Sequence, residues 1–224
     1  MSTALPEPAR SDARLAGWLV LVGTLALLNF VGNAESEPDP DFVYLWSSAI
    51  LGLIQFAVML AIILAITGRR QTREMLALRR PPSWWKALGL GAGLIVAVYI
   101  FVAALSPLLQ PGEEQGLTPS GWDAGRAPQF ITNLVVIAGF VPVVEELMFR
   151  GVGFTLLRRF GQTAAIVIVG AGFALVHGIA EGLPVFAFFG MGLAYLRSRT
   201  ASVYPCIAVH GAFNAVSLVL AVVV

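Results

Sequence analysis

Charged residues are scarce in this sequence. Only 12% of its 224 residues are Asp, Glu, Lys or Arg, whereas 58% are hydrophobic. A soluble chain carries about a quarter charged residues, so the composition excludes an ordinary soluble domain. The net charge is only +1 and no basic run has interleaved aromatic residues, so nucleic acid is not an expected partner.

Cysteine and the common local motifs of enzymes are also missing. Cys206 is the only cysteine, which excludes a disulfide within the chain. The sequence contains no Gly-rich phosphate loop, CxxC pair, HExxH or GxSxG motif. Nucleotide chemistry and the familiar serine hydrolase and zinc protease patterns therefore receive no support from local motifs.

Long apolar segments alternate with short polar ones. A helix needs roughly 20 mostly apolar residues to cross about 30 Å of hydrocarbon. We therefore expect an all-α, polytopic transmembrane bundle with six or seven spans, forming a single membrane domain over residues 1–224. The segment 183–196 is short, because fourteen residues rise only about 21 Å. The apolar segments are 15–31, 42–67, 84–109, 128–149, 163–180, 183–196 and 201–224.

The loops alternate between basic and acidic, with Arg126 the lone exception. By the positive-inside rule, residues 1–14 form a cytoplasmic tail and seven spans place the C-terminus outside. A cleaved signal peptide ending near Gly32-Asn33-Ala34 is the alternative for the first segment, although its apolar run is long for a signal. The basic groups are Arg10 and Arg14, six residues in 68–86, Arg158 and Arg159, and Arg197 and Arg199.

Very few ionisable groups interrupt the apolar segments, and such groups mark function because each central charge costs roughly 2.5–3.5 kcal/mol on insertion. Three side-chain pairs are spaced i,i+4, so each pair projects to one helix face. They are Glu146 with Arg150, Phe173 with His177, and His210 with Asn214; Glu145 is the remaining carboxylate.

The distance of each group along its helix, calculated from the helical rise per residue, places these groups at a similar depth in the membrane. We call this calculation the depth arithmetic. If the fourth helix continues to Arg158, Glu145 lies about 20 Å inward at 1.5 Å per residue. His177 then lies about 22 Å from the start of the fifth helix, and His210 and Asn214 about 16 and 22 Å along the last. A fourth helix ending at Arg150 would remove this agreement. Pro142, one turn before Glu145, predicts either an ordinary kink or a break that admits water.

The strings EELMFR from Glu145, FALVH from Phe173 and HGAFN from His210 resemble the EExxxR, FxxxH and HxxxN signatures of the CPBP family. This family includes type II CAAX prenyl endopeptidases and Abi-like proteins of bacteriocin self-immunity. The resemblance covers residues 128–218, which we expect to form the catalytic core. It implies an intramembrane endopeptidase in a prokaryotic plasma membrane, with a peptide or lipidated protein as substrate and the lipid bilayer as surroundings.

Carried over to this sequence, the resemblance implies that Glu145 and His177 activate a water, while His210 and Asn214 stabilise the oxyanion. The chemistry is consistent with these roles, since a carboxylate accepts a proton and an imidazole and an amide donate hydrogen bonds. Glu146, Arg150 and Phe173 are expected to support the site, with Glu146 paired to Arg150.

Two questions stay open at this point. His177, His210 and Glu145 or Glu146 can furnish a His₂Glu zinc set, but Asn214 suits an oxyanion donor better than a ligand, so we favour a water activated by glutamate without a cofactor. The buried Glu, His and Arg residues also suit a transporter or proton-coupled channel. A non-catalytic immunity scaffold is the third possibility.

Overall fold

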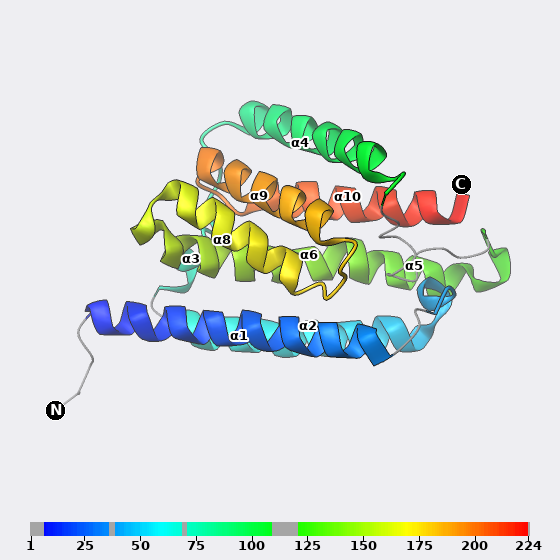
Figure 1. Cartoon of the computed structure of the whole chain (residues 1–224), viewed down its shortest axis with the longest axis horizontal. Coiled ribbons are helices and arrows are strands. Elements are labelled where there is room, and N and C mark those ends of the chain that lie inside the picture. Colours follow the sequence, from blue (N-terminus) through cyan, green and yellow to red (C-terminus); the bar gives the residue numbers. More distant parts are fainter. Residues whose placement is uncertain (1–6, 36–38, 69–70, 109–120, 224) are drawn as a thin grey trace.

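Each of the seven apolar segments contains helix in the computed structural model, which describes residues 7–35, 39–68, 71–108 and 121–223. No strand occurs in these residues, so the predicted all-α bundle is confirmed. Six helices correspond to six of the segments (Figure 1): α1 (Glu7–Glu35), α2 (Trp46–Thr67), α4 (Trp84–Leu105), α8 (Gln162–Leu175), α9 (Leu183–Thr200) and α10 (Tyr204–Val223). Because α1 begins at Glu7, part of the expected N-terminal tail is helical.

The fourth segment is longer than predicted. Instead of ending at Phe149 it continues to Phe160, so the condition for the depth arithmetic is met. Proline and two stretches of π-helix divide it without breaking it. Its parts are η3 (Ala124–Arg126), α5 (Ala127–Val135), η4 (Val136–Phe140), α6 (Val141–Glu146), η5 (Leu147–Gly153), α7 (Phe154–Leu157) and η6 (Arg158–Phe160).

Five helices of the described chain are long and apolar enough to cross a membrane, and this makes the protein an integral membrane protein. The two remaining segments are α8, which is apolar but has only 14 residues, and α9, whose last turn carries Arg197 and Arg199. Short elements complete the fold: η1 (Phe42–Tyr44) precedes α2, and α3 (Thr72–Met75) follows it.

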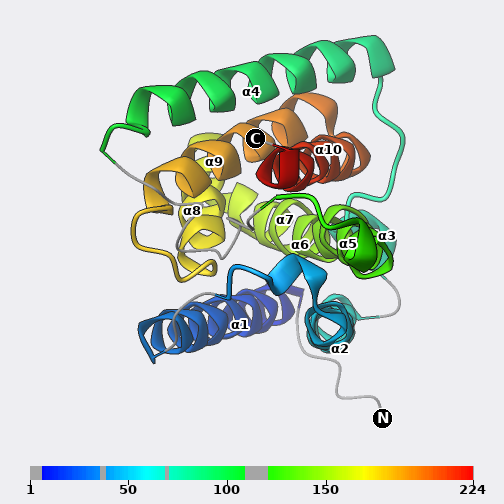
Figure 2. The ribbon, with the colours of Figure 1, turned by 90° about the vertical axis from the view of Figure 1, so that its right-hand side faces the viewer.

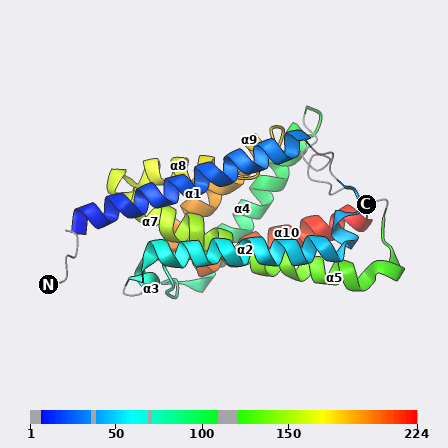
Figure 3. The same cartoon turned by 90° about the horizontal axis from the view of Figure 1, so that it is seen from below.

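The helices lie in layers around α6 and α7 (Figure 2). α4 covers α9 and α10 on one side, while α1 and α2 cover the opposite side. Seen from below, α1 crosses beneath α7 and α8, and α2 runs beneath α5 (Figure 3). The central position of α6 and the following π-helix explains why Glu146, Phe149 and Arg150 have no more than traces of exposed surface.

Basic segments gather at one end of the bundle, where the start of α1, α3 and the turns after α7 and α9 lie in Figure 1. Long-range contacts join them: Arg159 pairs with Asp12, and Thr155 donates a hydrogen bond to the Met75 carbonyl at 3.0 Å. At the other end Arg126 contacts Asp41 at 2.7 Å. The alternation of loop charge is therefore also a separation in space, while the side of the membrane on which each end lies stays a prediction.

Candidate active site

Pro142 changes the hydrogen-bond register of the helix that carries Glu145. The Val141 N–H bonds to the Val136 carbonyl, five residues earlier, in the π-helix η4. In the same register the Ile137 carbonyl would need an N–H at position 142, which proline lacks. The amide of Asn214 on α10 supplies the missing donor, with Nδ2 at 3.0 Å from the Ile137 oxygen. Asn214 is thereby fixed beside the turn that precedes Glu145.

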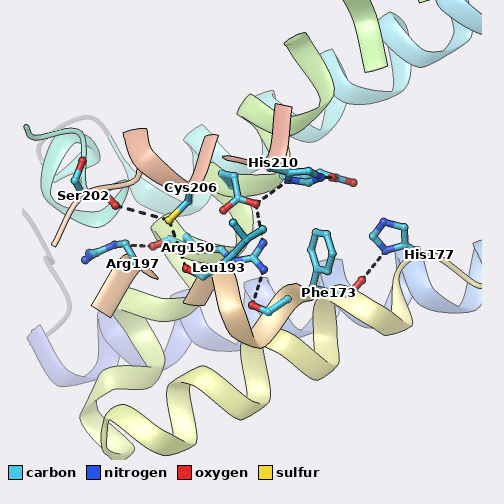
Figure 4. A network of polar contacts seen from close by, with 11 residues as sticks. Arg150, Phe173, His177, Leu193, Arg197, Ser202, Cys206 and His210 are labelled. Carbon is cyan, nitrogen blue, oxygen red and sulfur yellow. Dashed lines mark hydrogen bonds and ion pairs between the residues drawn. The ribbon is translucent and has the colours of Figure 1, made fainter. Parts of the chain in front are cut away.

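A buried polar chain lies behind Glu145. Arg150 Nη1 contacts Glu146 Oε1 at 2.8 Å, as the i,i+4 spacing predicts, and both side chains are fully buried. His210 Nδ1 lies 2.9 Å from the same oxygen, and its Nε2 lies 3.5 Å from Glu145 Oε2. Because the carboxylate paired with Arg150 only accepts hydrogen bonds, His210 Nδ1 donates and Nε2 is directed at Glu145. Figure 4 shows His210 at one end of this chain and Arg150 within it.

His177 lies beyond the end of its helix. The sequence pattern placed it inside the segment 163–180, but α8 ends at Leu175 and Val176 is the C-cap. Instead of projecting from the same helix face as Phe173, the His177 side chain is hydrogen-bonded to the Phe173 backbone. His177 Nδ1 lies 2.7 Å from the Phe173 carbonyl oxygen (Figure 4). Since a carbonyl only accepts, Nδ1 carries the hydrogen and the neutral ring keeps its lone pair at Nε2. The ring stacks on Phe186, with centroids 4.0 Å apart.

One cavity of about 410 Å³ brings the expected catalytic residues together. Glu145, His177, His210 and Asn214 all line it, so the four side chains come from α6, the turn after α8, and α10. The rest of the lining is apolar apart from Ser217. It includes Val102 of α4 and Phe186 and Phe189 of α9 among other residues.

The supporting residues occupy different places. Phe173 lines the cavity and also packs under the Arg150 guanidinium, whose carbon lies 4.6 Å from the ring centroid. Glu146 and Arg150 lie behind the lining, where they contact His210 and the Gly190 carbonyl respectively. Chemically, this arrangement offers a carboxylate, a ring nitrogen with a free lone pair and two side chains with hydrogen-bond donors around an apolar space.

Residues 127–216 match a family model described as type II CAAX prenyl endopeptidase Rce1-like. Over this segment, which is less than half of its length, the chain is similar to that family. The segment contains Glu145, His177, His210 and Asn214, and the match supports an intramembrane protease of the CAAX type in general. No curated protein and no solved structure matches the chain.

The fit of a metal ion to these residues depends on what their side chains already contact. In the described ranges, no group of three or more His, Cys, Asp or Glu side chains is arranged to hold one. His210 has a carboxylate near each ring nitrogen, and His177 has its Nδ1 at a carbonyl. The choice between a zinc ion held by His177, His210 and Glu145 and a water activated by glutamate without a metal therefore stays a prediction.

Two asparagines outside the matched segment escaped the sequence reasoning. Asn29 and Asn33 of α1 donate to backbone carbonyls of the turn that carries His177. Their i,i+4 spacing at the end of an apolar segment was a usable signal. Phe186 was missed as well, because nothing in the apolar run of α9 distinguishes a ring that stacks on histidine from one that packs in the core.

Proposed function

We propose that this protein is an intramembrane endopeptidase that hydrolyses a peptide bond near the C-terminus of a membrane-associated or prenylated CAAX-type substrate. The observation that carries the proposal is the single cavity lined by Glu145, His177, His210 and Asn214. Its apolar walls suit a lipidated or apolar chain end, and the family match supplies the reaction class.

Glu145 is the general base of the proposed reaction. A water molecule attacks the carbonyl carbon of the peptide bond while Glu145 accepts a proton from that water. His177 orients the water through Nε2, the ring nitrogen left free when Nδ1 bonds to the Phe173 carbonyl. When the tetrahedral intermediate collapses, the carbon–nitrogen bond breaks and Glu145 passes its proton to the departing amine.

His210 and Asn214 stabilise the negative oxygen of that intermediate. Glu146 accepts from His210 Nδ1, and Nε2 faces Glu145 and the cavity. Nε2 donates to the oxyanion when the ring is the doubly protonated imidazolium, which is the form that this role requires. One hydrogen of the Asn214 amide bonds to Ile137, which leaves the other as a donor. Removal of one such donor, held in place before the reaction, typically lowers kcat by roughly 10²–10³-fold.

A cleavage assay on the detergent-purified protein tests the proposal. Its substrates are a synthetic peptide with a farnesylated cysteine three residues from the end and the same peptide without the farnesyl group, read by mass spectrometry. Wild type should release the last three residues, whereas His177→Ala should lose most of that activity. Leu175→Ala, an exposed change two residues away, is the matched control and should remain active.

A chelator arm separates the two mechanisms. With water activated by glutamate, a zinc chelator leaves the rate unchanged. Loss of cleavage that returns on addition of zinc would contradict the proposed base. Cleavage that survives His177→Ala would contradict the role of His177. The absence of cleavage for every peptide offered would contradict the protease itself.

A further inference from the structure

The turn that carries His177 exposes three backbone carbonyls that the preceding helix cannot satisfy. Asn29 Nδ2 donates to the Val176 oxygen. Asn33 Nδ2 lies 3.0 Å from the Gly178 oxygen and 3.4 Å from the His177 oxygen. All three acceptors therefore receive an amide from α1, an element more than 140 positions away in the chain. Asn29 and Asn33 are called the asparagine pair below.

Carbonyls in this position need donors from outside their own helix, because the last carbonyls of a helix have no partner within it. Residues four apart lie on one face of a helix, so the asparagine pair presents two amides to the same turn. A carbonyl accepts and never donates, which fixes the nitrogen side of each amide toward it.

The helix that carries the asparagine pair is itself fixed to the catalytic helix. Trp18 Nε1 donates to the Met148 carbonyl at 3.0 Å, and the tryptophan is 1% exposed. It approaches so closely that a Cβ at Gly153 would lie 2.5 Å from its ring. Asn29 follows Trp18 by eleven residues, which is close to three turns, so both face the same way. α1 therefore connects the helix of Glu145 to the turn of His177.

The turn also lies directly against the backbone of α1. Gly178 has φ +66°, and a Cβ there would lie 2.5 Å from the Asn29 carbonyl carbon. Only glycine combines this left-handed conformation with such an approach. The imidazole is restricted on its two other sides by the Phe173 carbonyl and by the stacked Phe186 ring.

We propose that Asn29 and Asn33 are positioning residues that keep His177 Nε2 in the cavity, with Asn29 the more important because it is half-buried whereas Asn33 is exposed. The inference rests on the proposed function and extends it to an element outside the matched segment 127–216. Loss of the asparagine pair lets the turn move, and a shift of about 1 Å at a reacting group costs roughly 10²-fold in rate.

The test uses the full-length protein, the farnesylated peptide and three variants. Asn29→Asp keeps the shape but replaces the donor with an acceptor facing a carbonyl, and Asn33→Ala is the milder second variant. Leu28→Ala, exposed on the same helix, is the control. Asn29→Asp should lower kcat by about 10- to 100-fold with KM within about twofold. Asn33→Ala should lower it less, and Leu28→Ala should not change it.

A double-mutant cycle distinguishes positioning from general stability. When His177 is already alanine, Asn29→Asp should cause no further loss of the residual rate, because its effect passes through the imidazole. An equal loss in both backgrounds, or unchanged kcat in both asparagine variants, would overturn the inference. The proposed function fails separately, since it falls if the wild type cleaves none of the peptides.

Discussion

Arg150 forms polar contacts with three other residues. Its Nη1 pairs with Glu146, its Nη2 donates to the Gly190 carbonyl at 2.7 Å, and its own carbonyl accepts from Arg197 Nε at 3.1 Å. The side chain is fully buried. This arginine joins three helical segments and pairs with Glu146 beside His210, which matters because a buried charge without its partner is costly.

Arg150→Ala should destabilise the protein by about 3–5 kcal/mol, because it leaves Glu146 as an unpaired buried acid. The expected readouts are poor expression and a large drop in melting temperature in detergent. Arg199→Ala, which removes an exposed arginine, should change neither. A melting temperature for Arg150→Ala equal to wild type would refute this account of the buried pair.

Residue-scale features were predictable where they depend only on local geometry. The Glu146–Arg150 pair follows from i,i+4 spacing and formed as predicted. The position of His177 did not follow, because the end of α8 depends on hydrogen bonds from α1 that sequence spacing does not reveal. Residue types alone did not reveal the surroundings of His210, where Glu146 lies beside one ring nitrogen and Glu145 near the other.

At the scale of the element, π-helix is the main departure from expectation. Two π stretches flank α6, and Pro142 lies between them. Apolar composition predicted a helix here and a proline predicted a disturbance, but neither specifies the register. That register depends on which donor remains for each carbonyl, and for Ile137 the donor comes from α10.

The replacement of a proline N–H by Asn214 can be tested with a cycle of stability measurements. Asn214→Ala should cost about 1–3 kcal/mol in wild type, the penalty for a stranded buried carbonyl. In a Pro142→Ala background the new N–H at position 142 can serve the Ile137 carbonyl instead. The cost of Asn214→Ala should then be smaller by about 1 kcal/mol, measured by unfolding in detergent. The same cost in both backgrounds would show that the Asn214–Ile137 contact does not replace that N–H.

At the scale of the whole molecule, α1 is part of the bundle. Its buried Trp18 and its asparagine pair contact the helix of Glu145 and the turn of His177. Hydrophobicity alone predicted a span but could not show these contacts, since they join residues more than 100 positions apart. The cytoplasmic N-terminus and the prokaryotic plasma membrane stay predictions from loop charge and family resemblance.

The central claim is that Glu145 is the base of a peptide hydrolysis inside the bundle. Glu145→Gln keeps the size of the side chain but cannot accept a proton from water. Cleavage of the farnesylated peptide should therefore fall by roughly 10²–10⁴-fold, while Glu74→Gln, an exposed change of the same type, should retain it. Full cleavage activity of Glu145→Gln in a preparation free of contaminating protease would contradict the account.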